Sequence, residues 1–399
     1  MTGTGPLEGL RVLDLSGMLS GGYATMTLAD FGADVVSVEH PEHHDPIRDW
    51  PPFDDGTSLW WKSLARNKRC ITLDLGSDEG RALALELAAD ADLLFENFRP
   101  GTLERWGLDY GTLREVNEEL ILVRISGYGQ TGPKSDEPGF GTAAQAMSSF
   151  AHRNGYRDRE PLLAPISIAD IAAAGMAVQS ALFAIYERDV GGSGEGQVID
   201  VSLYEALFRM LPGDVEKFDR LGEVTERTGS HHPNAAPRNV YEAADGYVAL
   251  SASAQSIFEN LAETIGHPEL IEDPRFADNR SRVEHADELD GYIAPYVAER
   301  TVEEVVADLG AGDAVVAPIY DMRDVFADEQ YRARDDVVEV DDPDLGSIRT
   351  VAPLPKFSRT PGGVDHLGPG HGEHNEAVFV DELGLDESTV ADLRADGVV

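Results

Sequence analysis

Asp170 is the residue of this sequence best placed for covalent chemistry. It lies in the segment PISIADIAAAG at residues 165–175, and its two neighbours on either side are isoleucine or alanine. Apolar neighbours strip water from a carboxylate and make it a better nucleophile, while small residues leave room for a substrate. A short acceptor at the mouth of an apolar helix also suits an N-cap. The spacing leaves both roles open for Asp170.

Other reactive groups form weaker patterns. The pairs His43-His44 and His231-His232 are adjacent in sequence and have no H-E-x-x-H or cysteine partner, so we expect no metal site. No G-x-S-x-G sequence occurs, which argues against an α/β-hydrolase. Cys70 is the single cysteine and lies in an apolar run, so we expect a buried thiol and no internal disulfide.

The net charge is the most unusual bulk property. Asp and Glu number 73 against 32 Lys and Arg, which gives −41, and only five of the 32 are lysines. Such a charge opposes binding to nucleic acid or to an anionic membrane, so we expect neither as a partner. The acidic residues are spread along the whole chain. We interpret this as halophilic adaptation to molar salt, where the Debye length falls to about 3 Å. An acidic protein without that adaptation is the alternative.

The sequence lacks targeting features. The N-terminal sequence MTGTGPLEGL has neither a basic start nor an apolar core, so we expect no signal peptide. No apolar run approaches the roughly 18 residues that predict a membrane-spanning helix. Together with the single cysteine, these features predict a cytoplasmic protein.

The elements that must position these residues alternate between strands and helices. Apolar runs predict strands at 10–15, 34–39, 70–75, 92–98, 120–126 and 198–203, and helices at 23–31, 81–91 and 171–188. Strands separated by about ten to fifteen helical residues indicate βαβ units and a parallel sheet. The first turn, Gly17-x-x-x-Gly21-Gly22, is not the G-x-G-x-x-G fingerprint. We therefore predict an α/β fold with a Rossmann-like sheet that does not bind a dinucleotide in the usual way.

A change of pattern near residue 210 predicts a second domain. Residues 1–209 are expected to form the N-terminal part of the large domain, and 210–310 a smaller α+β domain with a strand at 247–250 and a helix at 257–265. Residues 311–399, with a strand at 315–319, are expected to return to the large domain.

Eight longer segments, spread almost from end to end, carry a family resemblance. They are PLEGLRVLDLS from Pro6, ADFGADVVSVEHP from Ala29, NKRCITLDL from Asn67, ENFRPGTLERWGLDY from Glu96, RISGYGQTGP from Arg124, GEGQVIDVSLYEAL from Gly194, APRNVYEAADGYVAL from Ala236 and ELIEDPRFADNRSR from Glu269. Their order and spacing resemble the class III CoA-transferases, which include formyl-CoA transferase, carnitine CoA-transferase and the α-methylacyl-CoA racemases.

The resemblance assigns Asp170 as the nucleophile. The family's acid is often followed by glycine as D-x-x-x-G, and here Ala174 takes that glycine position with Gly175 one residue later. The implied reaction begins when the carboxylate attacks an acyl-CoA thioester, which gives an aspartyl anhydride and CoA thiolate. The thiolate then forms an aspartyl-CoA thioester, and the acceptor acid reverses these steps. CoA thioesters are substrates, and no permanently bound cofactor is implied.

The resemblance also implies a CoA site. Its expected contacts are His40, Leu73, Asn97, Phe98 and Arg105. Two positions depart from the family, because His40 replaces an arginine and Gly76 replaces a frequent lysine, which weakens two phosphate contacts. The pair Lys68-Arg69 either compensates for these losses or has a solvated or structural role.

The acceptor site is the least defined part of the resemblance. Phe140 stands where the racemases need a histidine base, and Gly141 replaces a common acid. Leu19 replaces the glutamine that binds oxalate in formyl-CoA transferase. The segment GFGTAAQAMSSFAHRNG most resembles the mesaconate branch, in which His152 and Arg153 would bind a distal carboxylate; surface solvation is the alternative for both.

The segment TGSHHP resembles the family's flexible loop over the nucleophile. Its residues Gly229, Ser230, His231 and His232 are therefore candidate site residues, and a plain linker is the alternative. Family members are interlocked homodimers with the active site between the large domain of one chain and the small domain of its mate. We expect CoA transfer from succinyl-CoA to a mesaconate-like dicarboxylic acid. The alternatives are an acyl-CoA racemase or isomerase, opposed by Phe140, and a non-catalytic acyl-CoA binder, opposed by Asp170.

Overall fold

The computed structural model describes residues 5–399. The first four residues, part of the segment in which we expect no signal peptide, lie outside this range. The chain divides into two compact units. Unit 1 comprises the described residues up to Phe150, Ala164–Val215 and Tyr331–Val399, and unit 2 comprises Ala151–Leu163 and Glu216–Gln330.

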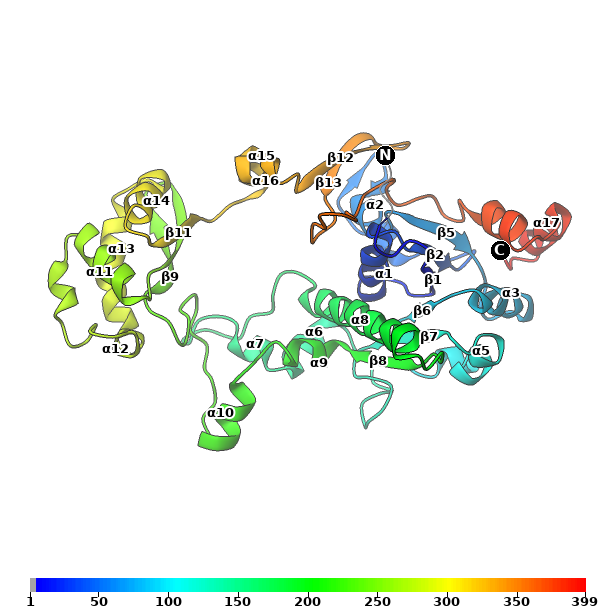
Figure 1. The fold of residues 1–399 in the computed structure, drawn as a ribbon, viewed down its shortest axis with the longest axis horizontal. Helices are drawn as coiled ribbons and strands as arrows, with labels where there is room; N and C mark the ends of the chain where they lie inside the picture. Colours follow the sequence, from blue (N-terminus) through cyan, green and yellow to red (C-terminus); the bar gives the residue numbers. More distant parts are fainter. Residues whose placement is uncertain (1–4) are drawn as a thin grey trace. The chain divides into compact units, whose positions relative to one another are not determined.

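Unit 1 is built on a six-stranded parallel sheet in the order β5-β2-β1-β6-β7-β8 (Figure 1). The strands are β1 (Arg11–Asp14), β2 (Asp34–Glu39), β5 (Lys68–Thr72), β6 (Leu93–Glu96), β7 (Ile121–Ser126) and β8 (Val198–Ser202). Counted along the chain, this is the strand order of the doubly wound Rossmann fold. The predicted parallel sheet is confirmed, and each predicted strand lies within about two residues of an observed one.

Helices cover both faces of the sheet. Alternate side chains along each strand turn to opposite faces, so the neighbours Val12 and Leu13 belong to different cores. The first core contains side chains of α1 (Ser20–Asp30), α6 (Gly141–Met147), α8 (Ile168–Tyr186) and α9 (Leu203–Phe208). The second contains side chains of α3 (Asp78–Ala89), α5 (Tyr110–Val116), η4 (Ala377–Glu382) and α17 (Glu387–Ala395). The C-terminal segment thereby returns to the sheet, and Figure 1 shows α17 beside α3.

Shorter elements complete unit 1, and three of them run across its boundaries with unit 2. They are η1 (Pro46–Asp49), β3 (Phe53–Asp54), β4 (Thr57–Ser58), α2 (Leu59–Leu64), α4 (Thr102–Arg105), α7 (Phe150–Arg153), η2 (Glu187–Gly191), α10 (Asp214–Leu221), α16 (Glu329–Ala333), β12 (Val337–Asp342) and β13 (Gly346–Val351). The hairpin β12-β13 is attached to α2 through Lys62, whose Nζ lies 2.8 Å from Asp342 and 2.7 Å from Asp344.

Unit 2 is a smaller α+β body around an antiparallel sheet in the order β11-β10-β9. Its elements are β9 (Arg238–Ala243), β10 (Gly246–Ser251), α11 (Gln255–Thr264), η3 (Pro268–Ile271), α12 (Asn279–Glu284), α13 (Ala286–Ala298), α14 (Val302–Gly310), β11 (Val315–Pro318) and α15 (Met322–Ala327). The domain boundary expected at residue 310 differs from this division. Because β11 pairs with β10, the strand predicted for the returning tail belongs to unit 2, which continues to Gln330.

Helix α8 is unusually apolar. Contrary to the expectation that no run is long enough, Ile168–Gly191 has the length and composition of a membrane span, with 24 residues. In unit 1, however, its residues Ala169, Ala173, Ala177 and Ala181 are fully buried in the first core, and α8 packs against α1. A buried core helix meets the same criterion, so this one helix is weak evidence for a membrane span.

Candidate active site

Asp170 lies in the first turn of α8, where it is the third helical residue. The N-cap of α8 is Ser167, whose side chain makes no capping hydrogen bond. The capping role left open by the sequence is therefore not the one observed for Asp170. A carboxylate in the first turn interacts favourably with the helix dipole, which supports the ionised form that a nucleophile requires.

The surroundings of Asp170 are apolar and close. A Cβ atom at Gly141 would lie 2.7 Å from Asp170 Oδ2, so the carboxylate occupies space that only glycine leaves free. Burial raises the pKa of Asp170 above its ordinary value, and no charged side chain within residues 5–399 offsets that burial. The carboxylate is thus half-buried without a counter-charge.

Two further glycines bring Gly141 into position. Gly127 follows β7, and a Cβ atom there would lie 2.5 Å from the Cα atom of Gly139. This backbone contact excludes a side chain at either position and fixes the approach to α6. Phe140 is the N-cap of α6 and is 69% exposed. It therefore precedes Gly141, the glycine next to the Asp170 carboxylate, but its own side chain is not buried.

A cavity of about 200 Å³ opens at the carboxyl ends of β1, β2, β5 and β6. It brings together three residues predicted to contact CoA, namely His40, Leu73 and Phe98. The remaining lining residues are Leu15, Ser16, Gly17, Val38, Glu39, His43, His44, Asp45, Pro46, Asp74, Leu75 and Trp106. The strand order reverses between β1 and β6, and doubly wound sheets bind ligands outside the carboxyl ends of strands at this point.

The cavity has an apolar wall suited to a flat base. The rings of Phe98 and Trp106 meet edge to face, with centroids 5.0 Å apart, and Leu73 lies beside them in the same lining. Sequence reasoning missed Trp106, His43 and His44. The available signal was position, because each follows an element that ends at this edge of the sheet.

Two predicted CoA contacts, Asn97 and Arg105, do not line this cavity. The side chain of Asn97 accepts a hydrogen bond from the Gly17 N–H at 3.0 Å and donates to the Gly17 carbonyl at 2.6 Å, so it orders the turn between β1 and α1. Arg105 donates to Thr102 Oγ1 at 2.8 Å within α4. Both remain candidates for contacts with a bound ligand.

The pair Lys68-Arg69 has the structural role that the sequence left open. Lys68 is buried, with Nζ 3.1 Å from Asp14 Oδ2 and 2.9 Å from the Gly22 carbonyl. Arg69 lies 2.7 Å from Asp34 and also pairs with Glu382. Neither residue lines the carboxyl-edge cavity. These contacts favour the structural alternative over compensation for the lost phosphate contacts.

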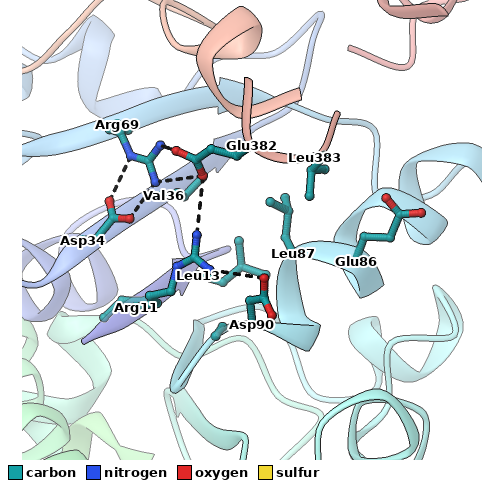
Figure 2. A pocket seen from close by; sticks show the side chains of 12 residues that line it. Arg11, Leu13, Asp34, Val36, Arg69, Glu86, Leu87, Asp90, Glu382 and Leu383 are labelled. Carbon is teal, nitrogen blue, oxygen red and sulfur yellow. Dashed lines mark hydrogen bonds and ion pairs between the residues drawn. The ribbon is translucent and has the colours of Figure 1, made fainter. Parts of the chain in front are cut away.

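A second cavity, of about 50 Å³, lies at the amino ends of β1, β2 and β5 (Figure 2). Two arginines border it, and both are paired. Arg69 is held by Asp34 and Glu382, while Arg11 lies 3.3 Å from Asp90 and 3.7 Å from Glu382. This small cavity is the centre of an ion-pair network that ties η4 to the sheet.

The predicted active-site loop lies in unit 2 and is anchored there. Gly229 has φ +62°, its N–H donates to the Gly155 carbonyl at 2.9 Å, and a Cβ atom there would lie 2.6 Å from the ring of Tyr156. His231 Nε2 lies 2.6 Å from Asp290 Oδ2 on α13. The hydrogen bond with Asp290 raises the pKa of His231. The loop is therefore tied to α13 by a specific contact.

Two of the acceptor-site candidates, His152 and Arg153, also lie in unit 2, whereas Phe140 and Gly141 lie in unit 1. His152 Nε2 is 3.9 Å from Glu226, beyond hydrogen-bonding distance, and the His152 carbonyl accepts from Arg227 at 2.8 Å. The pKa of His232 is lowered by burial and then by the nearby charges of Arg238 and Arg153. Ser230 completes the loop segment that bears His231 and His232. The positive charge near the loop is a feature that an anionic acceptor would recognise.

Metal ligation has no support in the arrangement of side chains. Across residues 5–399, no three or more His, Cys, Asp or Glu side chains gather in a way that could hold a metal ion. Cys70 is fully buried, and burial raises the pKa of its thiol, as expected for a structural cysteine.

Comparison with known proteins places the chain in a family. A family model described as CoA-transferase family III matches residues 7–375. The chain is 42% identical over 396 residues to the succinyl-CoA–D-citramalate CoA-transferase of Chloroflexus aurantiacus, covering 99% of this chain and 98% of that one. It is 36% identical to the succinyl-CoA:mesaconate CoA-transferase of Haloarcula hispanica, covering 96% and 98%.

A solved structure supports the same assignment. The crystal structure of a CAIB/BAIF family protein from Brucella suis has a TM-score of 0.84 and 32% identity, covering 95% of this chain and 99% of that chain. The relatives match nearly the full length of both sequences. The chain therefore belongs to CoA-transferase family III.

Proposed function

We propose that this enzyme transfers CoA from succinyl-CoA to a small dicarboxylic acid of the mesaconate or citramalate class. The observation that carries the proposal is the Asp170 carboxylate, which is half-buried, has no counter-charge and lies against Gly141. The names of two relatives, which act on D-citramalate and mesaconate, support the substrate class.

The proposed reaction uses Asp170 as a covalent nucleophile. Its carboxylate attacks the thioester carbonyl of succinyl-CoA, the C–S bond breaks, and CoA leaves as thiolate. The thiolate then attacks the aspartyl carbonyl of the anhydride, which releases succinate and leaves Asp170 as a CoA thioester. The acceptor carboxylate attacks that thioester, its C–S bond breaks, and a second aspartyl anhydride forms with release of thiolate. The thiolate then attacks the acyl carbonyl of the acceptor, which gives the new acyl-CoA and frees the Asp170 carboxylate. Desolvation favours the first attack because the Asp170 carboxylate has less water to lose.

The alternative of an acyl-CoA racemase requires a proton-abstracting base beside the thioester. Phe140 occupies the position at which the resemblance expects that base, and a phenyl ring cannot accept a proton. We therefore place transfer ahead of racemisation.

We infer that the acceptor's distal carboxylate binds at Arg153. Support comes from the charge that Arg153 and Arg238 exert near His232 in the loop. Replacing Arg153 with alanine should raise KM for dicarboxylate acceptors about tenfold while sparing any monocarboxylate acceptor. Equal losses for both acid classes would remove the distal-carboxylate role.

We also infer a homodimer. Helix α10 has no buried residue, and Val215, Phe218 and Leu221 are each at least 50% exposed, which suits burial against a second chain. Light scattering behind a sizing column should give twice the mass of the 43.2 kDa chain. A monodisperse monomer that is active would contradict this inference.

The function is tested by an acceptor screen at about 2 M KCl. Succinyl-CoA is incubated with mesaconate, citramalate, malate or glutarate, and CoA esters are measured by mass spectrometry. A new ester formed in equal amount with succinate is expected. Hydrolysis without a new ester, or isomerisation of the acyl group alone, would contradict transfer. Hydroxylamine added after succinyl-CoA should label Asp170, and a label on another carboxylate would contradict the mechanism.

A further inference from the structure

Glu96, the last residue of β6, uses both of its carboxylate oxygens and is 1% exposed. Its Oε1 accepts a hydrogen bond from Arg124 Nε at 2.6 Å, and its Oε2 accepts one from the Phe98 N–H at 2.8 Å. Arg124 is the register neighbour of Glu96 on β7, whereas Phe98 belongs to the turn that follows β6. One buried carboxylate therefore connects the sheet to the backbone that carries Phe98.

Arg124 extends this connection to α4. It is 8% exposed, and its Nη1 and Nη2 atoms donate to the Glu104 carboxylate at 2.7 and 3.3 Å. Glu104 lies on α4, and Trp106 is the C-cap of that helix. A planar guanidinium can donate along two of its edges at once in a fixed geometry, which a lysine ammonium cannot do. The row Glu96–Arg124–Glu104 thus holds the two segments whose aromatic rings meet in the apolar wall of the carboxyl-edge cavity.

Asp14 repeats the arrangement at the end of β1. It is fully buried, accepts from the Ser16 N–H at 3.0 Å and pairs with Lys68 at 3.1 Å. In both turns, the carboxylate that ends the strand accepts the N–H group two residues later. The Asn97 side chain joins the two turns through its hydrogen bonds with Gly17. Buried ion pairs therefore order both turns at the point where the strand order reverses, which is where doubly wound sheets bind ligands.

An amide cannot replace Glu96 in this network. Both contacts come from donors, and a glutamine has one acceptor oxygen and an NH2 group that would face the other donor. Asp30 provides a comparison, because its pair with Arg66 is also buried, with contacts of 2.9 and 2.5 Å. Asp30 does not line the carboxyl-edge cavity or bond to a turn that does. The two buried pairs thus separate a role in the cavity from a role in stability alone.

We propose that Glu96 is a positioning residue for CoA recognition, which acts with Arg124 and Glu104 to fix Phe98 and Trp106 against each other before the ligand binds. The proposal deepens the proposed function and rests on it, because it assumes that CoA occupies the carboxyl-edge cavity. A preformed wall avoids the entropy cost of ordering two segments on binding. Loss of the network therefore weakens CoA binding and leaves the chemistry at Asp170 intact.

The test combines calorimetric binding of CoA with transfer kinetics in fixed molar KCl. Glu96→Gln should raise the Kd for CoA and the KM for succinyl-CoA about tenfold, the value of one contact between a base and an aromatic ring. Its kcat should stay within about twofold of wild type, since no group that touches the reacting atoms is changed. Asp30→Asn is the matched control, and it should lower the melting temperature while leaving Kd and KM unchanged.

Glu104→Gln provides a second, milder variant. The Glu104 side chain is 42% exposed, and this change leaves the buried pair of Glu96 and Arg124 intact, so the protein should fold. Loss of its ion pair should raise the Kd for CoA about threefold and leave kcat unchanged. This variant decides the question if Glu96→Gln does not fold.

The outcomes are distinct. The positioning role is overturned if folded Glu96→Gln binds CoA as the wild type does, if its kcat falls while its affinity is kept, or if Asp30→Asn loses as much affinity. If Glu96→Gln is unfolded, wild-type affinity in Glu104→Gln overturns it. A wild type that binds CoA but transfers it to no acid overturns the proposed function, and the Kd comparison still tests Glu96. A folded wild type that binds no CoA overturns both.

Discussion

The two edges of the parallel sheet carry cavities of opposite character. At the amino edge, Arg11 and Arg69 are each held between carboxylates, and the network joins β1, β2 and β5 to η4 (Figure 2). At the carboxyl edge, the same strands border a larger cavity with an apolar wall, three histidines and no arginine or lysine. Ion pairs occur near both cavities, but arginines line only the one at the amino edge.

This contrast shows that, in a strongly acidic chain, paired charges stabilise the fold at one edge of the sheet while a different set of residues is available for ligand binding. The chain has 73 acidic and 32 basic residues, and Arg11, Lys68 and Arg69 on the strands each pair with a carboxylate. Asp34 and Asp170 illustrate the difference, since Asp34 pairs with Arg69 at 2.7 Å whereas burial without a partner raises the pKa of Asp170. A carboxylate without a counter-charge is therefore more informative about function here than a cluster of charges.

The largest expected effect comes from exchanging these two carboxylates for amides. Asp170→Asn should lower transfer more than about 10³-fold, because it removes a covalent nucleophile. It should leave the melting temperature unchanged or higher at neutral pH, since the raised pKa of Asp170 means that its ionised form opposes folding. Transfer assays and thermal unfolding measure the two effects.

Asp34→Asn is the matched control at the amino edge. It should retain wild-type kcat and lose at most about 1 kcal/mol of stability, because the Asp34 side chain is 42% exposed and its ion pair is screened by solvent. Activity of Asp170→Asn within about tenfold of wild type would abolish the functional contrast between the two carboxylates.

The second expected effect concerns salt. Ion pairs such as those at the amino edge gain strength when salt is removed, whereas the net charge of −41 then repels itself over a Debye length of about 30 Å at 0.01 M. Folding is held by only about 5–15 kcal/mol, so we expect repulsion to dominate and the protein to unfold or dissociate in dilute buffer.

Circular dichroism and sizing from about 2 M down to 0.05 M KCl distinguish the two forces. Loss of secondary structure at the low end supports halophilic adaptation. A protein that becomes more stable as salt falls would show that the internal ion pairs outweigh the net charge, and the acidity would then need another explanation.

A third, smaller effect tests the apolar wall. Phe98→Ala should raise KM for succinyl-CoA about tenfold, the value of one aromatic contact with a base, and leave kcat nearly unchanged. Leu383→Ala is the counterpart at the amino-edge cavity, where it should lower stability without a change in KM. Equal KM values for the two variants would mean that the adenine does not bind against this wall.

Local sequence patterns were sufficient to predict the strands of the sheet and most of α8, although the helix predicted at 171–188 begins after Asp170 and the observed helix begins at Ile168. The strands and helices depend on residues close together in the chain, whereas the parallel sheet was inferred from their alternation, because its pairs join distant residues such as Leu122 and Val198. The N-cap alternative for Asp170 could be decided only from the backbone, which places the cap at Ser167. The family resemblance, and not spacing, made Asp170 the leading nucleophile.

Contacts between distant segments could not be predicted in this way. Arg69 pairs with Glu382, 313 residues away, so its structural role was invisible in the sequence. The strand β11 pairs with β10 across five helical elements, which moved the domain boundary beyond 310. His43, His44 and Trp106 share a cavity only because their separate loops end at one edge of the sheet.

The smallest expected effect extends the comparison to unit 2, where His231 is held by Asp290. Because the hydrogen bond with Asp290 raises the pKa of His231, the folded loop binds the proton more tightly than the unfolded chain does. The contact is therefore fully stabilising below the ordinary histidine pKa of about 6.5. That stability is lost as the pH rises through the higher pKa of the folded state.

Hydrogen exchange at residues 228–232 measures this contribution once the rates are expressed as protection factors. Protection in the wild type should fall as the pH rises above about 6.5, and His231→Asn should show low protection without that dependence. The effect is limited because the His231 side chain is 23% exposed and backbone bonds, such as that from Gly229 to Gly155, also hold the loop. His267→Asn is the control, since its pairing with Glu269 is more exposed and distant in sequence from the loop. Equal protection at all pH values in the wild type would mean that backbone hydrogen bonds alone anchor the loop. His231 would then have no structural role, in contrast to the paired arginines of the amino edge.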